Sequence, residues 1–365
     1  MRVKLEDVCV RGSSNLKQSD VIDKTGEYPI YGAAGYIGNV DFYHQDQPYV
    51  AVIKDGAGIG RTSLYPAKSS VIGTMQYLLP KENVLPEYLC YVVKYMHLEK
   101  YFTGATIPHI YFKDYKKEEF NLDTLDRQKE IVNILGRIEC VISSRQQELQ
   151  KLDELIKARF VEMFGDPVAN DMGWNTLPLE KACKSIVDCP HSTPSYTNED
   201  TGFMCIRTSI VKKNKILWDD IEYIPEDEFV KRIQRKKPEV GDIVYTREGA
   251  ILGIAAIIDR DCNVALGQRS MLLSPDIDKC TSAFVCVAMN SDSFLDNVLK
   301  GVSGSASPHI NVGDIKAFRM IMPPVELQKQ FSDFVNQVYK SKVAVQKALD
   351  ETQLLFDSLM QEYFG

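Results

Sequence analysis

The stretch "FTGATIPHIYFKDYKK", residues 102–117, returns as "VSGSASPHINVGDIKA" at residues 302–317. The copies lie 200 positions apart, and the same offset aligns further identical residues without a gap. Two amphipathic helices that merely look alike would explain the shared leucines, but not the shared loop before them. The chain therefore contains an internal duplication. The first members of the identical pairs include Lys100, Gly104, Asp114, Lys116, Gln128, Lys129, Leu149, Leu155, Glu162, Phe164 and Gly165.

Each repeat ends in a long helical pattern. Apolar residues follow alternating steps of three and four, which is the spacing of a coiled-coil seam. No proline interrupts either run, and each run of about 39 residues would span roughly 58 Å as a helix. A helix with one apolar stripe must bury it, and the other copy is the expected partner. The seam residues are Ile131, Leu135, Ile138, Ile142, Leu149, Leu152, Ile156 and Met163, then Phe331, Val335, Val338, Val345, Leu349, Phe356, Leu359 and Tyr363.

One cation interrupts each seam, Arg145 in the first and Lys342 in the second. Charges at such positions commonly fix the register and orientation of paired helices. The alternative is that each side chain lays its stem along the seam and extends its charge into solvent. Both interpretations stay open at the level of sequence.

Two non-helical blocks, 1–125 and about 166–325, precede the helices. Both contain short β-like runs broken by Gly, Pro and Asn. "PYVAVIKDGAGIGRTSLYP" (48–66) and "GDIVYTREGAILGIAAII" (241–258) each predict a strand, a glycine turn and a strand. The turns align Asp55, Gly56 and Gly60 with Glu248, Gly249 and Gly253. We therefore expect an α+β fold organised as block 1–125, helix 126–165, block 166–325 and helix 326–365.

Composition and motifs argue against several function classes. With 44% hydrophobic and 25% charged residues, the chain is typical of a globular protein. The N-terminus has no long apolar run, so neither a signal peptide nor a membrane helix is expected. Nine cysteines without a CxxC pair predict no metal site and a reduced, cytoplasmic setting. "GAGIGRT" (56–62) lacks the spacing of a phosphate loop, and no catalytic motif is apparent. No cofactor is expected.

The net charge of −7 argues against strong non-specific nucleic-acid binding by the whole chain, but local basic clusters remain. Arginine, glutamine and threonine read base edges, and lysine positions phosphates. The alternative for each charge run is a solvated surface. The repeated histidines could serve as bases, as contacts to the DNA backbone or as residues that order their loop. The candidate DNA contacts are Lys54, Arg61, Thr74, Gln76, His109, Thr208, Lys212, Lys213, Arg235, Lys236, Thr246, Arg247, Gln268, Arg269 and His309.

The order of block, helix, block and helix resembles the specificity subunit of type I restriction–modification systems over essentially the whole chain. "SASPHINVGDIKAFRMIMPPVELQKQF" (305–331) looks like the end of a target-recognition domain that runs into a conserved helix. "FVEMFGDP" (160–167) is similar to the segment that closes the first half in that family, and "GDIVYTREGAILGIAAI" with "LGQRSMLL" looks like a recognition-domain core. "LDTLDRQKEI" (122–131) departs from the family by lacking Pro-Pro-Leu before its glutamine.

The resemblance implies two target-recognition domains that each read one half of a bipartite DNA site, with two long antiparallel helices as a ruler between them. It also implies two modification subunits, which bind S-adenosylmethionine and methylate adenine, and a motor-nuclease subunit for restriction. The specificity chain itself would hold no catalytic site. The competing hypotheses are a duplicated coiled-coil scaffold without DNA specificity and an enzyme with an unrecognised motif. Preference for a specific duplex would reject the scaffold, and binding of S-adenosylmethionine by the isolated chain would support the enzyme.

Overall fold

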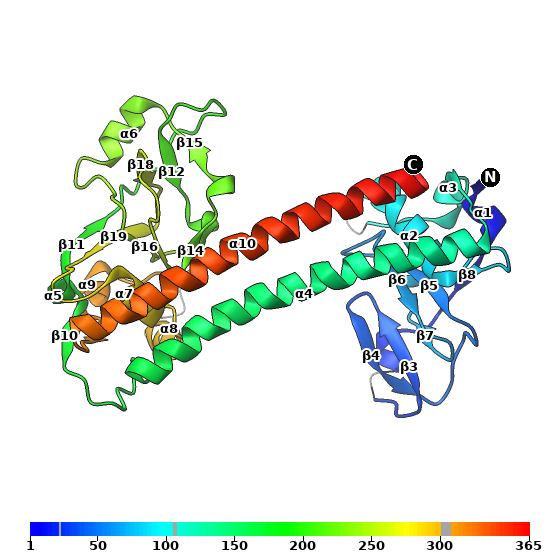
Figure 1. Ribbon diagram of the computed structural model, residues 1–365, viewed down its shortest axis with the longest axis horizontal. Helices are drawn as coiled ribbons and strands as arrows, with labels where there is room; N and C mark the ends of the chain where they lie inside the picture. Colours follow the sequence, from blue (N-terminus) through cyan, green and yellow to red (C-terminus); the bar gives the residue numbers. More distant parts are fainter. Residues whose placement is uncertain (22, 105–107, 301–307) are drawn as a thin grey trace. The chain divides into compact units, whose positions relative to one another are not determined.

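The computed structural model describes residues 1–21, 23–104, 108–300 and 308–365 (Figure 1). Part of the repeated loop, residues 105–107 and 301–307 with Gly304 among them, lies outside these ranges. The chain forms two compact units. Unit 1 comprises Met1–Gln147 and Gln346–Gly365, and unit 2 comprises Glu148–Val345. Each of two 40-residue helices, α4 (Leu125–Phe164) and α10 (Val325–Phe364), therefore begins in one unit and ends in the other.

Unit 1 is built around a four-stranded antiparallel sheet in the order β2-β8-β5-β6. A three-stranded sheet, β4-β3-β7, and the pair β1-β9 complete its strands. The elements before α4 are β1 (Arg2–Lys4), α1 (Leu5–Val8), β2 (Cys9–Ser13), η1 (Gln18–Asp20), β3 (Tyr28–Gly32), β4 (Gly35–Val40), β5 (Tyr49–Ile53), β6 (Thr62–Tyr65), β7 (Ser70–Val71), β8 (Met75–Pro80), α2 (Pro86–Tyr95), η2 (Leu98–Tyr101), α3 (Phe112–Tyr115) and β9 (Glu119–Asn121).

Unit 2 contains a four-stranded sheet in the order β11-β19-β16-β17, a three-stranded sheet β15-β12-β18, and the pairs β10-β20 and β13-β14. Its elements before α10 are β10 (Thr176–Pro178), α5 (Leu179–Ala182), β11 (Cys183–Asp188), β12 (Met204–Ile206), η3 (Thr208–Ile210), β13 (Val211–Lys212), β14 (Lys215–Ile216), η4 (Trp218–Asp220), β15 (Glu222–Tyr223), α6 (Glu226–Arg232), β16 (Ile243–Thr246), β17 (Ala255–Ile257), β18 (Val264–Leu266), β19 (Ser270–Pro275), α7 (Ser282–Met289), α8 (Asp292–Lys300), α9 (Val312–Ala317) and β20 (Arg319–Ile321).

The two units share one topology. Strands β2, β8, β5 and β6 have the same order and antiparallel pairing as β11, β19, β16 and β17. The second sheets also agree, because β3 pairs antiparallel with β4 and parallel with β7, as β12 pairs with β15 and β18. Unit 2 adds the β13-β14 hairpin and the helices α6 and α8. The α+β fold and the internal repeat expected from the sequence are thus confirmed.

The core of unit 1 includes residues from both ends of the chain. Strand β5 is buried on both faces, and α2 packs its Tyr88 and Leu89 into the same core. Ile131 and Leu135 enter from the start of α4, and Met360 and Phe364 enter from the end of α10. The ring of Phe364 lies 5.2 Å from that of Tyr88. The last turns of the chain therefore belong to the N-terminal unit.

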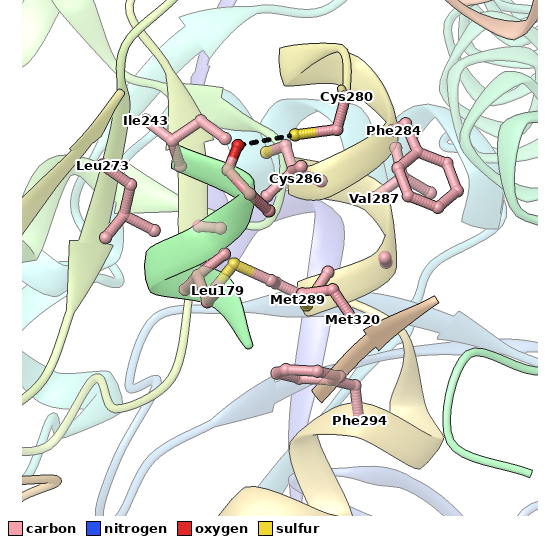
Figure 2. Close-up of a cluster of buried hydrophobic side chains, with 14 of the residues drawn as sticks. Leu179, Ile243, Leu273, Cys280, Phe284, Cys286, Val287, Met289, Phe294 and Met320 are labelled. Atoms are coloured by element: carbon pink, nitrogen blue, oxygen red, sulfur yellow. Dashed lines mark hydrogen bonds between the residues drawn. The ribbon is translucent and has the colours of Figure 1, made fainter. Parts of the chain in front are cut away.

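The core of unit 2 repeats this arrangement with the helices exchanged. Phe160 and Phe164 at the end of α4 pack against Phe284 of α7 and Phe331 of α10, with ring centroids 4.9–5.5 Å apart. Figure 2 shows the neighbouring part of this core, where Leu179, Ile243 and Met289 converge. The thiol of Cys280 donates a hydrogen bond to the carbonyl of Ala182 there. The core of unit 2 thus includes the end of α4, the helix that follows the first block, 1–125, in the sequence.

The predicted seams are confirmed, since all the seam residues named above are buried or half-buried. In unit 2 the two helices run antiparallel, because Phe160 meets Phe331 whereas Asp153 meets Lys342. Lys342 donates to the carboxylate of Asp153 on the other helix, and its charge lies 5.6 Å from the ring of Tyr339. For Lys342 the structure therefore favours the role in register and orientation over simple extension into solvent.

Replacement of Phe364 by alanine should destabilise unit 1, although this residue lies next to the C-terminus. Removing a buried aromatic ring from a packed core costs about 3–5 kcal/mol. Hydrogen exchange should therefore accelerate at the amides of α2 and leave those of α7 near their native rates. Val161→Ala is the control, because Val161 is exposed on α4. Equal acceleration in α2 and α7, or none in α2, would contradict the assignment of Phe364 to unit 1.

Candidate nucleic-acid interface

The repeated Pro-His-Ile segments occupy the same place in the two units. In unit 1 the amide of Ile110 donates to the carbonyl of Lys54, and the amide of Gly56 donates to that of Pro108. In unit 2 Ile310 and Gly249 make the same bonds to Arg247 and Pro308. Each segment is thus fastened to the glycine turn that follows the central strand of its sheet.

The two glycine turns have matching geometry. Gly60 donates to the carbonyl of Ile53, as Gly253 donates to that of Thr246. Gly56 and Gly249, at equivalent positions, have φ angles of +85° and +91°. A residue with a Cβ is strained at such angles, so glycine is required at both positions. The alignment of Asp55 with Glu248 is confirmed by their bridges to His109 and His309.

In unit 1 the turn carries a cluster of two basic side chains around one carboxylate. Asp55 accepts hydrogen bonds of 2.7 Å from Lys54 Nζ and from His109 Nδ1. Burial alone would raise the pKa of Asp55, but the hydrogen bonds and charges of Lys54 and His109 outweigh it and lower this pKa. His109 therefore orders its loop through Asp55, which was one of the three roles considered for it. Thr74 supports the turn, because its carbonyl accepts from the amides of Lys54 and Asp55.

In unit 2 the equivalent end of the sheet carries a larger cationic cluster. Arg247 directly follows β16, and its guanidinium binds Asp188 at the end of β11 with an Nε–Oδ1 distance of 3.0 Å. His191 binds the other oxygen of Asp188 at 3.0 Å, and Arg235 donates to its backbone carbonyl. Arg269, which precedes β19, accepts a backbone hydrogen bond from Arg247 and keeps its side chain exposed. Asp188 thus binds Arg247 and His191 through its carboxylate and Arg235 through its carbonyl at one end of the sheet.

The structure therefore brings together Lys54, Thr74, Gln76 and His109 in unit 1, and Arg235, Thr246, Arg247, Gln268, Arg269 and His309 in unit 2. Arg61 lies at the far side of its glycine turn, where it donates to the carbonyl of Ala33. Gln268 accepts a hydrogen bond from Thr193, and His309 is exposed. These placements make one end of each four-stranded sheet the candidate interface.

Four candidates lie in other settings within unit 2. Lys213 pairs with Asp292 at 2.9 Å, and Lys212 donates to the carbonyl of Ser209. Lys236 pairs with Asp242 at 2.7 Å. Thr208 is half-buried in the short helix η3. These four residues lie away from the glycine turns, so they are weaker candidates than the residues at the sheet ends.

Three candidates need a correction. Gln76, Thr246 and Arg247 are buried, and a buried side chain cannot reach a base edge without a rearrangement. Arg247 instead donates to the carboxylate of Asp188 through Nε and Nη2. The hydroxyl of Thr246 instead accepts a hydrogen bond from the amide of Ile254 across the glycine turn. Gln76 accepts a hydrogen bond from Tyr115 inside the core. All three residues support the surface from within.

The sequence had not pointed to Asp188 or His191. Neither belongs to a basic run or to the repeat, and Asp188 lies 59 positions before its partner Arg247. The only local signal is a polar segment, "DCPHS", directly after a strand. Among the residues described, no group of three or more His, Cys, Asp or Glu is arranged to hold a metal ion. Within the same ranges no helix is both long and apolar enough to cross a bilayer.

Known structures show this fold elsewhere. The chain is similar over its whole length to the S subunit of a type I restriction-modification system from M. genitalium, with a TM-score of 0.59 and 14% identity, covering 96% of that chain. A structure described in terms of complex assembly and conformational transition of the type I R-M system gives a TM-score of 0.53 at 16% identity and is covered to 97%. These likenesses concern the fold.

Sequence comparisons agree with the structures. The chain is 22% identical to the type I restriction enzyme MjaVIII specificity subunit of Methanocaldococcus jannaschii over 79% of this chain and 72% of the relative. The MjaIX specificity subunit of the same organism is 20% identical over 78% and 69%. The family described as type I restriction modification DNA specificity domain matches residues 1–154 and 187–352. The chain therefore belongs to this family and is a type I specificity subunit with two target-recognition domains.

Proposed function

We propose that each unit reads one half of a bipartite DNA site and that the two long helices set the gap between the halves. The observation that carries this proposal is the repetition of one topology with different side chains at the same sheet end. Lys54 and Asp55 stand where Arg247 and Glu248 stand in unit 2. Similar backbones with different polar groups suit two readers of different sequences. The recognition domains are then 1–125 and 166–325, and the spacer helices are 126–165 and 326–365.

The exposed side chains of the candidate interface are the proposed base and phosphate contacts. Arg269 keeps its side chain exposed beside the glycine turn of unit 2, and an exposed guanidinium suits the bidentate recognition of guanine. Lys54 supplies a phosphate contact, because a compact positive charge can position the DNA backbone without reading sequence. Acidic and basic residues are nearly balanced over the chain as a whole, with 43 Lys and Arg against 50 Asp and Glu. Partners that add positive surface would therefore complete the grip on the duplex.

The proposed partners are two modification subunits that dock on the helices. Leu155 and Leu355 occupy equivalent repeat positions, yet they are 46% and 51% exposed. Leu155 lies in unit 2 and Leu355 in unit 1, so each unit presents one such leucine on a long helix. Exposed apolar side chains that recur at equivalent positions suggest the same docking surface twice. S-adenosylmethionine binding, adenine methylation and DNA cleavage would then reside in other subunits, in the cytoplasm, and this chain would be non-catalytic.

A protein-interaction scaffold without DNA specificity finds no support in the comparisons. The decisive experiment is co-expression of the chain with a modification subunit of its own system, followed by mapping of methylated adenines across the host genome. We expect a single motif of two short half-sites separated by a fixed gap. A complex that forms but methylates without any motif would contradict the proposed function.

Arg269→Ala should alter one half-site only. Losing a bidentate base contact costs about 1–3 kcal/mol of discrimination, which is roughly a 5- to 150-fold loss of preference at one base. The methylation map should therefore lose stringency within the half-site read by unit 2, while the other half-site and the gap stay unchanged. Lys213→Ala is the matched control, because it removes an exposed cation of unit 2 that lies outside the interface. An unchanged motif with Arg269→Ala would remove this residue from the readout.

Leu155→Lys and Leu355→Lys should weaken docking without unfolding the chain, since both side chains are already largely solvated. Native mass spectrometry should find two modification subunits on the wild-type chain, one on each single variant and none on the double variant. Gln150→Lys makes a similar change on another face of the same helix and should keep both subunits. Full occupancy of the double variant would place the docking surface elsewhere.

A further inference from the structure

A buried glutamine lies in the first turn of each long helix. Gln128 and Gln328 are identical repeat positions, and both side chains are 0% exposed. A buried primary amide is costly unless its hydrogen-bonding groups find partners. The way these two amides are satisfied shows what each glutamine connects.

Gln128 joins three backbone segments of unit 1. Its Oε1 accepts from the amide of Leu85 at 2.9 Å, and its Nε2 donates to the carbonyls of Asn83 at 3.0 Å and Asp123 at 2.9 Å. Leu85 is the residue that caps the N-terminus of α2, and Asp123 lies just before α4. The side chain therefore ties the start of the long helix to the start of α2.

Gln328 makes the same three bonds in unit 2. Its Oε1 accepts from the amide of Thr281 at 3.0 Å, and its Nε2 donates to the carbonyls of Lys279 at 3.2 Å and Pro323 at 2.8 Å. Thr281 is the N-cap of α7, and Pro323 stands where Asp123 stands before the first long helix. The pattern is retained although the segments before the two glutamines, "NLDTLDR" and "IMPPVEL", have no identical residue at equivalent positions.

The tied helices α2 and α7 lead directly to the candidate interface. Helix α2 packs on β5, β6 and β8, and α7 packs on β17 and β19. These strands belong to the four-stranded sheets whose ends carry Lys54 and Arg247. A continuous series of packed elements therefore connects each interface to its long helix, and in each unit the glutamine lies at the junction between sheet layer and helix.

We infer that Gln128 and Gln328 are positioning residues that fix the angle between each recognition sheet and its long helix and thereby set the tolerated gap between the half-sites. Three hydrogen bonds from one planar amide restrain both rotation and sliding of the helix start, which packing of apolar side chains alone restrains less. The inference rests on the proposed bipartite recognition. It adds that selectivity for the gap depends on two side chains that touch no DNA.

The test replaces each glutamine by methionine, which has a similar length and fills the same space without the amide. Gln128→Met and Gln328→Met are each co-expressed with the modification subunit, and methylated adenines are mapped. We expect both half-sites to be kept while preference for the native gap over a gap one base pair longer or shorter falls by about tenfold. Lys129→Met and Lys329→Met are the matched controls, because these neighbours are exposed and pair only with an acid three residues earlier. They should keep the wild-type gap.

Several outcomes would overturn the inference. A methionine variant that folds and methylates with wild-type gap selectivity would show that the glutamine only satisfies buried backbone groups. If the methionine variants do not fold, Gln128→Asn and Gln328→Asn are tested instead. Asparagine keeps the amide group but places it on a side chain that is one methylene shorter. A relaxed gap in these variants supports the inference, whereas a native gap or loss of folding overturns it. Absence of a bipartite motif with the wild-type chain would instead refute the proposed function, so the two failures are distinguishable.

Discussion

The burial of each helix end in the unit where the other helix begins is the constraint on which the rest of the structure depends. Phe164 completes the core of unit 2, and Phe364 completes the core of unit 1. A long helix with a single apolar stripe is marginal in water until that stripe is covered. Because each unit supplies cover for the helix that arrives from the other, the two halves of the chain stabilise each other, and neither core is built from one continuous segment.

This mutual packing explains why the sequence repeat is recognisable in the long helices and in the cores but less so at the sheet ends. Residues that pack into the core of each unit, or that tie each long helix to its sheet layer, are identical in the two repeats. Examples are Phe164 with Phe364 and Gln128 with Gln328. The sheet ends obey a weaker constraint, because their backbone turns match while their side chains differ. A recognition subunit needs this division, since the framework must stay the same on both sides whereas the two surfaces must read different bases.

Much of the fold could be predicted from the sequence, because periodicity and repetition are local signals. The helices, their seams and the alignment of the glycine turns follow from such patterns. Phe160 was not among the predicted seam residues. It is buried by Phe284 of α7 and by Phe331 of α10, and the periodicity of its own helix does not predict the contact with α7. The pairing of Arg247 with Asp188 was equally inaccessible, because sheet topology and not sequence spacing brings the last residues of β11 and β16 to the same end of the sheet. Burial of Gln76 and Thr246 likewise depends on tertiary packing.

The central claim is that the helices measure the gap while the units read the half-sites. The most direct measurement removes one seven-residue repeat from each helix at equivalent positions, 143–149 and 343–349, which preserves the seam and shortens each helix by about 10 Å. Methylated adenines are then mapped with the modification subunit present. The account predicts the same two half-sites with a shorter gap. The native gap retained with both helices shortened would contradict it.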